Sequence, residues 1–442
     1  MTDTVSNKTP LLPLLSVNFI GTLGYSIIIP FLVYLVEGFG GNAVVYGVLG
    51  AAYSAFQLVG APVLGRWSDR VGRKRILLLS QLGTFLSWVI FAAALLLPVR
   101  ELATVQSGLL GSFAVSLPLL LLFVARAFDG LTGGNVSVAN AYLADVSSEE
   151  NRNRNFGKMS ISANLGFILG PALAGLLGAT VLGEMLPVLA AMGISFAAIF
   201  IILALLPESR PCAMQTWQGN QGVRKVLGQE HKECYDLDSP RKPSLSEVLR
   251  IPQIPLYLLL YFLIFLGFNI FYTAFPVHAV RSLGWPVSSM GFFFSILSGV
   301  MILFQGPVLS RLSRKLSEGT LVLLGSAVLA VCFFLLGASS TVLTFAAALF
   351  FAAGNGLMWP SYLSLLSKRG GAEVQGAVQG IASSAGSLAS IVGLILGGVL
   401  YELLGPTTFF VSGGVIVLVF LLSIRVRAPR PATVRRATIA AS

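Results

Sequence analysis

Runs of about 20 apolar residues follow one another along this sequence, separated by short polar connections. A helical run of that length can cross the hydrocarbon core of a bilayer. The composition agrees, because 55% of the residues are hydrophobic and only 11% are charged, unlike an ordinary soluble domain. The sequence therefore predicts an all-α integral membrane protein whose twelve transmembrane helices lie near residues 11–36, 45–65, 76–98, 117–143, 159–180, 186–206, 254–276, 289–310, 320–338, 342–366, 376–402 and 406–424.

The net charge of +11 is gathered on one side of the predicted membrane. If both termini and the connections after even-numbered spans share a side, that side holds 26 of the 29 Lys and Arg residues. Such an excess marks the cytoplasmic side, so we expect a multi-pass protein of the cell (inner or plasma) membrane with both termini in the cytoplasm. We expect no nucleic-acid binding, which would need a basic face on a folded soluble module.

Segments of the first half recur in the second half. Three pairs of segments resemble each other in the same order, at 60–75 and 306–319, 128–131 and 354–357, and 165–178 and 392–405. A common order places corresponding spans in corresponding positions. The predicted fold is therefore two pseudo-symmetric six-helix bundles, an architecture common among secondary transporters.

One long polar stretch separates the halves. Residues 207–253 have few aliphatic side chains and read as a flexible cytoplasmic linker, with one short amphipathic helix near 244–250. The predicted domains are an N-terminal bundle, the linker, a C-terminal bundle and a basic cytoplasmic tail, at 1–206, 207–253, 254–424 and 425–442.

The turn GRWSDRVGRKR at 65–75 is the first candidate for a functional role. Gly65 is expected to let the turn approach a neighbouring helix, and Gly72 to adopt a conformation that other residues resist. Asp69 and Arg73 are four residues apart and could pair on one helical face. Topology alone would explain the cations of this turn, but an acidic residue such as Asp69 adds nothing to the positive-inside pattern.

Asp145 lies at the next connection on the same side of the membrane. Asp145, Arg152 and Arg154 are candidate partners across the bundle for the charges of the turn at 65–75. A carboxylate at the membrane edge could also face the positive N-terminal end of a helix in the other half.

Arg126 and Asp129 lie nine and twelve residues into the fourth span. Ionisable residues at that depth are costly and usually functional, and the i, i+3 spacing lets them partly neutralise each other. The same face continues through Gly133, Ser137 and Asn140, so we expect it to point into the bundle or a water-filled cavity. The alternative is a buried pair that only holds helices together.

Gly166, Gly170, Pro171 and Gly175 line one side of the fifth span. Proline removes a helix hydrogen bond and bends the helix, and glycine at such intervals allows close helix contact. These residues suit a moving interface, although small-residue packing alone would give the same pattern.

Neutral polar and aromatic side chains recur at helical spacing in several other spans. If their faces converge, they line an aromatic and mildly polar cavity, which suits apolar or amphiphilic molecules better than sugars or phosphates. The candidate substrate-binding residues are Asn18, Thr22, Tyr25, Tyr53, Gln57, Asn140, Tyr261, Asn269, Tyr272, Asn355, Trp359, Gln379 and Ser383. For any single residue of this set, packing is the simpler explanation.

The sequence indicates neither an enzyme nor a metal protein. No Cys/His cluster has metal-site spacing, no nucleophile–base set is present, and no phosphate-binding P-loop occurs, so we expect no catalytic residue, no cofactor and no ATP drive. His278, which follows Pro276 at the end of the seventh span, is expected on the surface, with proton sensing as the alternative.

Three motifs make the chain resemble the major facilitator superfamily, and within it the twelve-span drug:proton antiporters of the tetracycline-efflux group. They are the loop motif at 65–75, RAFDGLTGGNVSVANAYLAD at 126–145 and GFILGPALAG at 166–175. The resemblance implies that Asp69, Arg73 and Asp145 form an inner lock that holds one conformation. It implies that Arg126 takes part in proton transfer, and that Gly170 and Pro171 shape the fifth helix for exchange.

The chain departs from these relatives at two places. Many of them carry a membrane-embedded acid in the first span, and this chain has none there. The second copy of the turn has Arg314 and Ser317 where the first has Asp69 and Gly72, so we expect an asymmetric lock in which the second copy is mainly a cationic anchor.

Asp129 is the only carboxylate placed deep in a span, so it is the predicted proton site. Its protonation would weaken the pairing with Arg126 and shift the balance between two alternating conformations. The expected function is proton-driven efflux of a small apolar or amphiphilic molecule by a monomer in the lipid bilayer, with the proton gradient as driving force. The alternatives are uptake or facilitated diffusion of a nutrient by the same fold, and a membrane enzyme or receptor.

Overall fold

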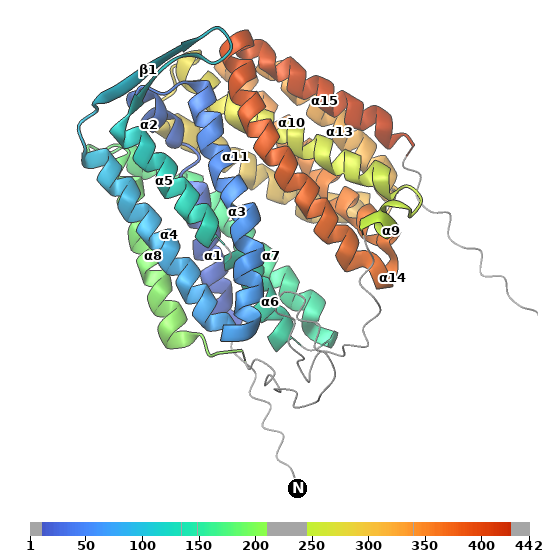
Figure 1. Ribbon diagram of the computed structural model, residues 1–442. Helices are drawn as coiled ribbons and strands as arrows, with labels where there is room; N and C mark the ends of the chain where they lie inside the picture. Colours follow the sequence, from blue (N-terminus) through green and yellow to red (C-terminus); the bar gives the residue numbers. More distant parts are fainter. Residues whose placement is uncertain (1–10, 134, 148, 210–244, 339, 426–442) are drawn as a thin grey trace, which may run out of the picture.

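The computed structural model describes residues 11–133, 135–147, 149–209, 245–338 and 340–425. Helices dominate both halves (Figure 1). The first half contains α1 (Leu11–Ile27), α2 (Leu32–Gly38), α3 (Ala43–Val71), α4 (Arg73–Leu96), β1 (Glu101–Ser107), β2 (Gly111–Ser116), α5 (Leu117–Thr132), α6 (Asn135–Val146), α7 (Glu149–Gly178) and α8 (Met185–Leu205). The second half contains α9 (Leu245–Leu249), α10 (Ile254–Arg281), α11 (Val287–Leu303), a π-helical turn (Phe304–Val308), α12 (Leu309–Leu312), α13 (Glu318–Leu336), α14 (Thr341–Leu404), a 3-10 turn (Gly405–Thr407) and α15 (Thr408–Ser423).

The helices fit the predicted set of spans. Ten helical segments among the described residues are long and apolar enough to cross a membrane. One of them, Gly380–Ser423, contains the last two predicted spans, and α5 with α6 supplies the fourth. The protein is therefore an all-α, multi-pass membrane protein of the predicted class, and the short helix expected near 244–250 is present as α9. Most of the predicted linker, residues 210–244, and the basic tail from 426 onward lie outside the described residues.

The fourth span is not the single helix that was predicted. α5 ends at Thr132, Gly133 donates its N–H to the Gly130 carbonyl at 3.1 Å, and a new helix begins at Asn135. The prediction of one continuous polar face from Arg126 to Asn140 is therefore wrong, because the break changes the rotation of everything that follows it.

A two-stranded antiparallel hairpin, β1–β2, joins α4 to α5 and was not predicted. It bonds to the connection after α2, since the Ala114 N–H donates to the Gly40 carbonyl at 2.8 Å and the Ser116 hydroxyl donates to the Phe39 carbonyl at 2.8 Å. In the second half α13 ends at Leu336 and α14 begins at Thr341, so the equivalent connection is much shorter. Figure 1 shows the hairpin lying across one end of the first half.

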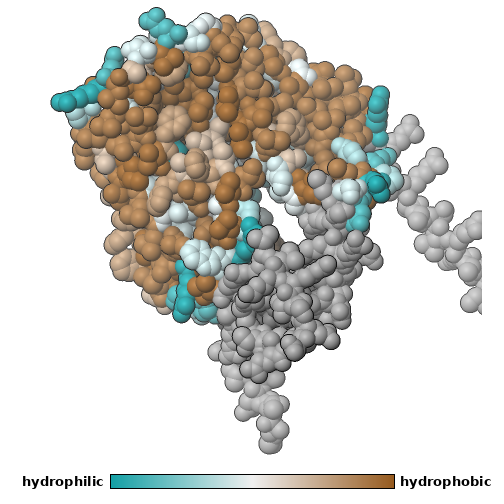
Figure 2. Space-filling model, in the orientation of Figure 1, coloured by the Kyte–Doolittle hydropathy of each residue, from teal (hydrophilic) through white to brown (hydrophobic). Residues whose placement is uncertain are grey.

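The two ends of the molecule differ in charge, and we name them for what they carry. The hairpin end holds β1, β2 and the connections near 38–42, 282–286 and 405–407. The basic end holds the charged turn at 65–75 and its echo at 306–319. Between the ends, apolar side chains cover the visible flanks of both bundles, as expected for a surface that faces lipid (Figure 2).

Glycine contacts confirm that the halves are related. A Cβ added to Gly166 would lie 2.8 Å from an atom of α1, and one added to Gly393 would lie 2.8 Å from an atom of α10. Gly170 and Gly397 repeat this relation four residues further along the same helices. The recurrence of 165–178 at 392–405 therefore reflects a shared packing of the fifth span on the first and of the eleventh on the seventh.

Two close helix crossings join the halves. α7 meets α11 where a Cβ on Gly291 would lie 2.5 Å from the Cα of Gly175. α3 meets α14 where Gly398 lies against the Ala43 carbonyl. Both crossings use a glycine to bring two backbones together, and they are equivalent under the relation between the halves.

Polar contacts tie the bundles together at the hairpin end. Arg281 of α10 pairs with Glu37 of α2 at 2.6 Å and with Glu402 of α14 at 3.0 Å. The Tyr34 hydroxyl donates to the Trp285 carbonyl at 2.6 Å. From this joined end, α3 and α14 diverge toward the basic end (Figure 1).

Candidate functional site: a cavity between the bundles

A cavity of about 610 Å³ lies between the two bundles, half-way along their length. The first half contributes residues of α1, α3, α4, α5 and α7, and the second half contributes residues of α10 and α14. The cavity is lined by Asn18, Gly21, Thr22, Gly24, Tyr25, Tyr53, Ser54, Gln57, Thr84, Trp88, Asp129, Gly133, Ala163, Phe167, Tyr261, Phe265, Ser383, Ser387 and Ser390. Its wall combines aromatic rings with hydroxyls and amides and carries one carboxylate.

That carboxylate, Asp129, is held by two side chains. The Arg126 guanidinium lies 3.4 Å from one of its oxygens, and the Thr84 hydroxyl donates to the other at 2.9 Å. Arg126 is 5% exposed and also lies over the ring of Tyr53, 4.4 Å from the ring centroid. The i, i+3 pairing predicted from the sequence is present, and it lies directly at the cavity wall.

Tyr53 is fixed from two sides. Gln57 donates one amide N–H to the Tyr53 hydroxyl at 3.0 Å and another to the Gly133 carbonyl at 3.2 Å, so it links this ring to the break after α5. A Cβ on Gly130 would lie 2.5 Å from the Tyr53 carbonyl, so the residue after Asp129 has to be small for α5 to pack on α3. Tyr25 packs against Tyr53 with ring centroids 5.3 Å apart.

Seven of the candidate substrate-binding residues line the cavity, namely Asn18, Thr22, Tyr25, Tyr53, Gln57, Tyr261 and Ser383. Asn18 and Thr22 each donate one side-chain hydrogen bond within the protein. Asn18 donates to the Met159 carbonyl at 3.0 Å, and Thr22 donates to the Asn18 carbonyl at 2.8 Å. Their remaining polar atoms are what they can offer to a bound molecule.

Five other candidates lie outside the cavity lining, namely Asn140, Asn269, Tyr272, Asn355 and Trp359. Asn269 donates to the Ser390 hydroxyl at 3.0 Å, and Asn355 donates to the Met301 sulfur at 3.2 Å. Trp359 packs behind the wall, edge-on to Tyr261 with ring centroids 5.3 Å apart. The side chain of Gln379 lies outside the described residues.

The lining residues that the sequence did not predict include Thr84, Trp88 and Phe167. The sequence predicts the third span only as an apolar crossing. Its polar side chains Gln81, Thr84 and Ser87 recur every three residues, which would have indicated an inward-facing stripe.

At the basic end, the first charged turn contains part of the predicted lock. Arg73 donates through Nε to Asp145 at 2.9 Å and through an Nη to the Ser68 hydroxyl at 2.7 Å. Asp145 is therefore the candidate partner that pairs with the turn, through Arg73. The side chains of the other candidates, Arg152 and Arg154, and that of Asp69 lie outside the described residues.

The two glycines of this turn behave differently. Gly72 has φ of +109°, which confirms that it adopts a conformation other residues resist. The prediction for Gly65 is wrong in this conformation, because a Cβ there would meet nothing within 4 Å.

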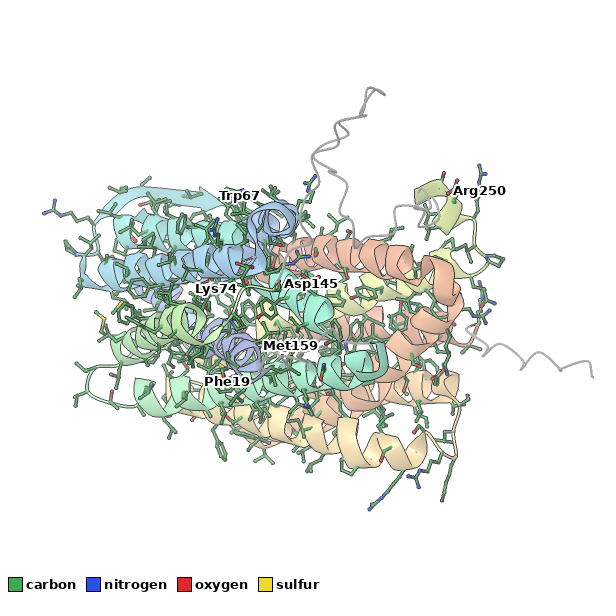
Figure 3. All side chains as sticks on the ribbon, turned by 90° about the horizontal axis from the view of Figure 1, so that it is seen from below. Phe19, Trp67, Lys74, Asp145, Met159 and Arg250 are labelled. Atoms are coloured by element: carbon green, nitrogen blue, oxygen red, sulfur yellow. The ribbon has the colours of Figure 1, made fainter. Side chains whose placement is uncertain are left out.

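Glu208, which follows α8, was not predicted to contribute to the lock. Its carboxylate accepts the Lys74 N–H at 3.0 Å and so caps α4 from a distant part of the chain. Figure 3 views this end from below, with Asp145 near the middle, Lys74 to its left and Arg250 at the far edge of the second half. Phe19 and Met159 appear close together there, in agreement with the contact of α1 and α7.

The second turn is more than the cationic anchor that was predicted. Glu318, the first residue of α13, accepts hydrogen bonds from the Lys368 ammonium at 2.6 Å and the Ser364 hydroxyl at 2.5 Å. In the sequence repeat Glu318 aligns with Arg73, and each pairs with a residue at the basic end of the span that follows its own. The second half therefore contains a corresponding ion pair in which the charges are exchanged.

The four residues of the fifth-span motif do not face one partner. Gly166 and Gly170 pack on α1, and Gly170 lies against the Ser26 hydroxyl. Gly175 instead packs on Gly291 of the other half, and α7 continues as a helix through Pro171. This motif thus connects the wall of the cavity with the crossing between the bundles.

His278 is fully buried, so the prediction of a surface position is wrong. Its Nδ1 lies 3.2 Å from the Tyr401 hydroxyl, and its ring packs edge-on to Phe409 with centroids 5.2 Å apart. Pro276 is buried beside it within an uninterrupted α10, which continues to Arg281 and so keeps His278 inside the bundle.

Comparison with known proteins agrees with this geometry. The family model described as "Major Facilitator Superfamily" matches residues 14–393. The chain belongs to the major facilitator superfamily. It is a transporter of small molecules across a membrane.

Relatives within the superfamily include resistance proteins. Over 399 residues the chain is 28% identical to the class E tetracycline resistance protein of Escherichia coli, covering 90% of this chain and 88% of that one. Over 418 residues it is 26% identical to multidrug resistance protein 2 of Bacillus subtilis, covering 93% of each. Among solved structures, a D-xylose–proton symporter superposes with a TM-score of 0.71 at 16% identity, covering 93% of this chain and 96% of that one, which shows a shared fold.

Proposed function

We propose that this transporter exports small apolar or amphiphilic organic molecules in exchange for protons. The observation that carries the proposal is the position of the Asp129–Arg126 pair at the wall of an aromatic cavity between two bundles. A carboxylate there can exchange a proton with the cavity that holds the substrate. The resistance proteins among its relatives support export of drug-like molecules.

The cavity wall suits such substrates. Tyr25, Tyr53, Trp88, Phe167 and Tyr261 offer flat apolar surface, while serine hydroxyls and Gln57 offer a few hydrogen bonds. In this proposal the basic end faces the cytoplasm, as the positive-inside rule predicts, so the conformation joined at the hairpin end takes up substrate from inside. The monomer works without a cofactor or ATP, and the proton gradient drives the cycle.

The proton gradient supplies enough free energy for this work. One charge moving down the membrane potential provides about 2.3 kcal/mol per 100 mV, which would sustain roughly a 50-fold concentration ratio of substrate.

The test is substrate accumulation in inside-out vesicles with an imposed pH gradient, screened with drugs, dyes, sugars and amino acids. The wild type should concentrate an amphiphilic compound inside. Asp129→Asn should exchange the same compound down its gradient but should not concentrate it, because the carboxyl proton that couples the two fluxes is gone. Glu101→Gln, which neutralises an exposed carboxylate on the hairpin, is the matched control and should behave as the wild type.

Asp129→Asn that still accumulates substrate with an unchanged pH dependence would rule out the proton-site assignment. Accumulation of sugars or amino acids in right-side-out vesicles instead would favour the uptake alternative.

A further inference from the structure

The ring of Tyr53 separates the cavity from the buried charge of Arg126. Tyr53 lines the cavity, whereas Arg126 is buried and lies over the Tyr53 ring with its guanidinium carbon 4.4 Å from the ring centroid. A molecule in the cavity therefore meets this ring before it can meet the guanidinium.

Arg126 is held by few contacts. Its nearest contact to Asp129 is long, at 3.4 Å, and its Nε has no hydrogen-bond partner among the described residues. A buried guanidinium normally uses most of its five donors. Arg126 is thus shared between a carboxylate and an aromatic face, and a small movement of the ring changes the balance between these two partners.

The contacts that hold the Tyr53 ring are made by residues that line the cavity, so a bound molecule can change them. Its hydroxyl is held by Gln57, itself a lining residue, and its ring packs on Tyr25, another lining residue. An aromatic substrate that stacks between these rings competes with the packing that now keeps Tyr53 against Arg126.

We propose that Tyr53 is the positioning residue that links occupancy of the cavity to the proton on Asp129. A substrate draws the Tyr53 ring away from Arg126, the guanidinium closes on Asp129, and the carboxyl releases its proton to water in the cavity. The proposal rests on the proposed function, since it assumes that Asp129 carries the coupled proton.

Electrostatics sets the direction in which the pH of half-protonation of Asp129 moves. A cation brought closer to a carboxyl group favours its ionised form, so the group is half-protonated at a lower pH. The other ionisable groups close to this pair are Tyr25, Tyr46 and Tyr53. Unperturbed tyrosine titrates near pH 10, so Asp129 is the group that exchanges a proton in the working range.

The test measures the infrared carbonyl band of protonated Asp129 against pH in the purified full-length protein. The band is assigned by its loss in Asp129→Asn. Tyr53→Leu, which removes the aromatic face, should move the midpoint to lower pH by about 0.5–1 unit, while Tyr53→Phe keeps the ring and should keep the wild-type midpoint. Phe196→Leu is the matched control and should keep the wild-type midpoint, because Phe196 is an aromatic residue of the same half that packs on Phe85 outside the cavity lining.

Addition of tetracycline supplies the second readout. It should lower the midpoint of the wild type and leave that of Tyr53→Leu where it was. Equal midpoints in wild type and Tyr53→Leu would overturn the proposal, as would a wild type that binds tetracycline without a shift. A lower midpoint in Tyr53→Leu supports it even when vesicles accumulate no substrate, so this proposal and the proposed function can fail separately.

Discussion

Gly72 shows how a single residue position in the charged turn satisfies two constraints. Its φ of +109° is one that residues with a side chain rarely adopt. A Cβ there would also lie 2.8 Å from the carboxylate of Glu208, which caps α4 by accepting the Lys74 N–H. Glycine cannot cap the helix itself, so the cap comes from the segment after α8, and Gly72 leaves room for it.

This arrangement predicts a measurable contribution from Glu208. Glu208→Ala removes a hydrogen bond at the N-terminus of α4 and a negative charge near its positive end, which should cost about 1 kcal/mol. The unfolding temperature of the purified protein should then fall by about 1 °C. Glu184→Ala is the control, because Glu184 precedes α8 but makes no capping bond. Equal shifts in the two variants would contradict the capping role.

At the scale of helices, the crossing of α7 and α11 depends on two facing glycines. Gly291→Ala should be destabilising and should slow transport, because its Cβ would lie 2.5 Å from the Cα of Gly175 and would push the bundles apart. Gly299→Ala on the same helix has open space and should be neutral or stabilising by about 0.5–1 kcal/mol. Thermal unfolding and transport rate measured on both variants check this, and a Gly291→Ala protein with wild-type transport would refute it.

The sequence predicts where the helices lie far better than it predicts which side chains of each helix face the cavity. The positions of the spans follow from long apolar runs, which lipid demands whatever the packing. The break after Thr132 could not be read, because the apolar run continues through it. Whether Asn355 or Gln57 faces the cavity depends on helix rotation and tilt, which packing between helices decides and which helical spacing alone leaves open.

The charged motifs were easier to interpret than the cavity. Ionisable residues in or beside lipid are costly unless they are paired. The sequence therefore indicates Arg126 with Asp129, and Arg73 with Asp145, as candidate ion pairs. Thr84 donates to Asp129 but is neutral, so only the polar spacing of the third span points to it. Glu208 accepts the Lys74 N–H from a part of the chain distant in sequence, and nothing in its own neighbourhood indicates that role.

For the whole molecule, Arg281 holds the hairpin end closed. Arg281→Gln removes its ion pairs with Glu37 and Glu402, which are partly exposed, so the loss of about 1 kcal/mol should shift the ratio of conformers about fivefold toward one open at this end.

Spin labels at Leu109 and Val342, one on each half and both exposed, would report the change as a longer distance in a variant lacking the native cysteines. Lys368→Gln breaks a pair within one bundle and is the matched control. An unchanged distance distribution in Arg281→Gln would show that the ion pairs do not hold this end closed.

At the basic end, α4 begins with a cation and α13 begins with an anion, so the two halves differ in the stability of these helix ends. A helix N-terminus favours an anion and disfavours a cation. The dipole of α13 therefore stabilises Glu318 at its N-terminus, whereas the dipole of α4 destabilises Arg73 at its own. The carboxylate of Glu208 offsets part of this unfavourable interaction. We therefore expect the basic end of the first bundle to rearrange more easily than that of the second. When the transporter changes conformation, the first bundle should move before the second, although the two halves share one fold.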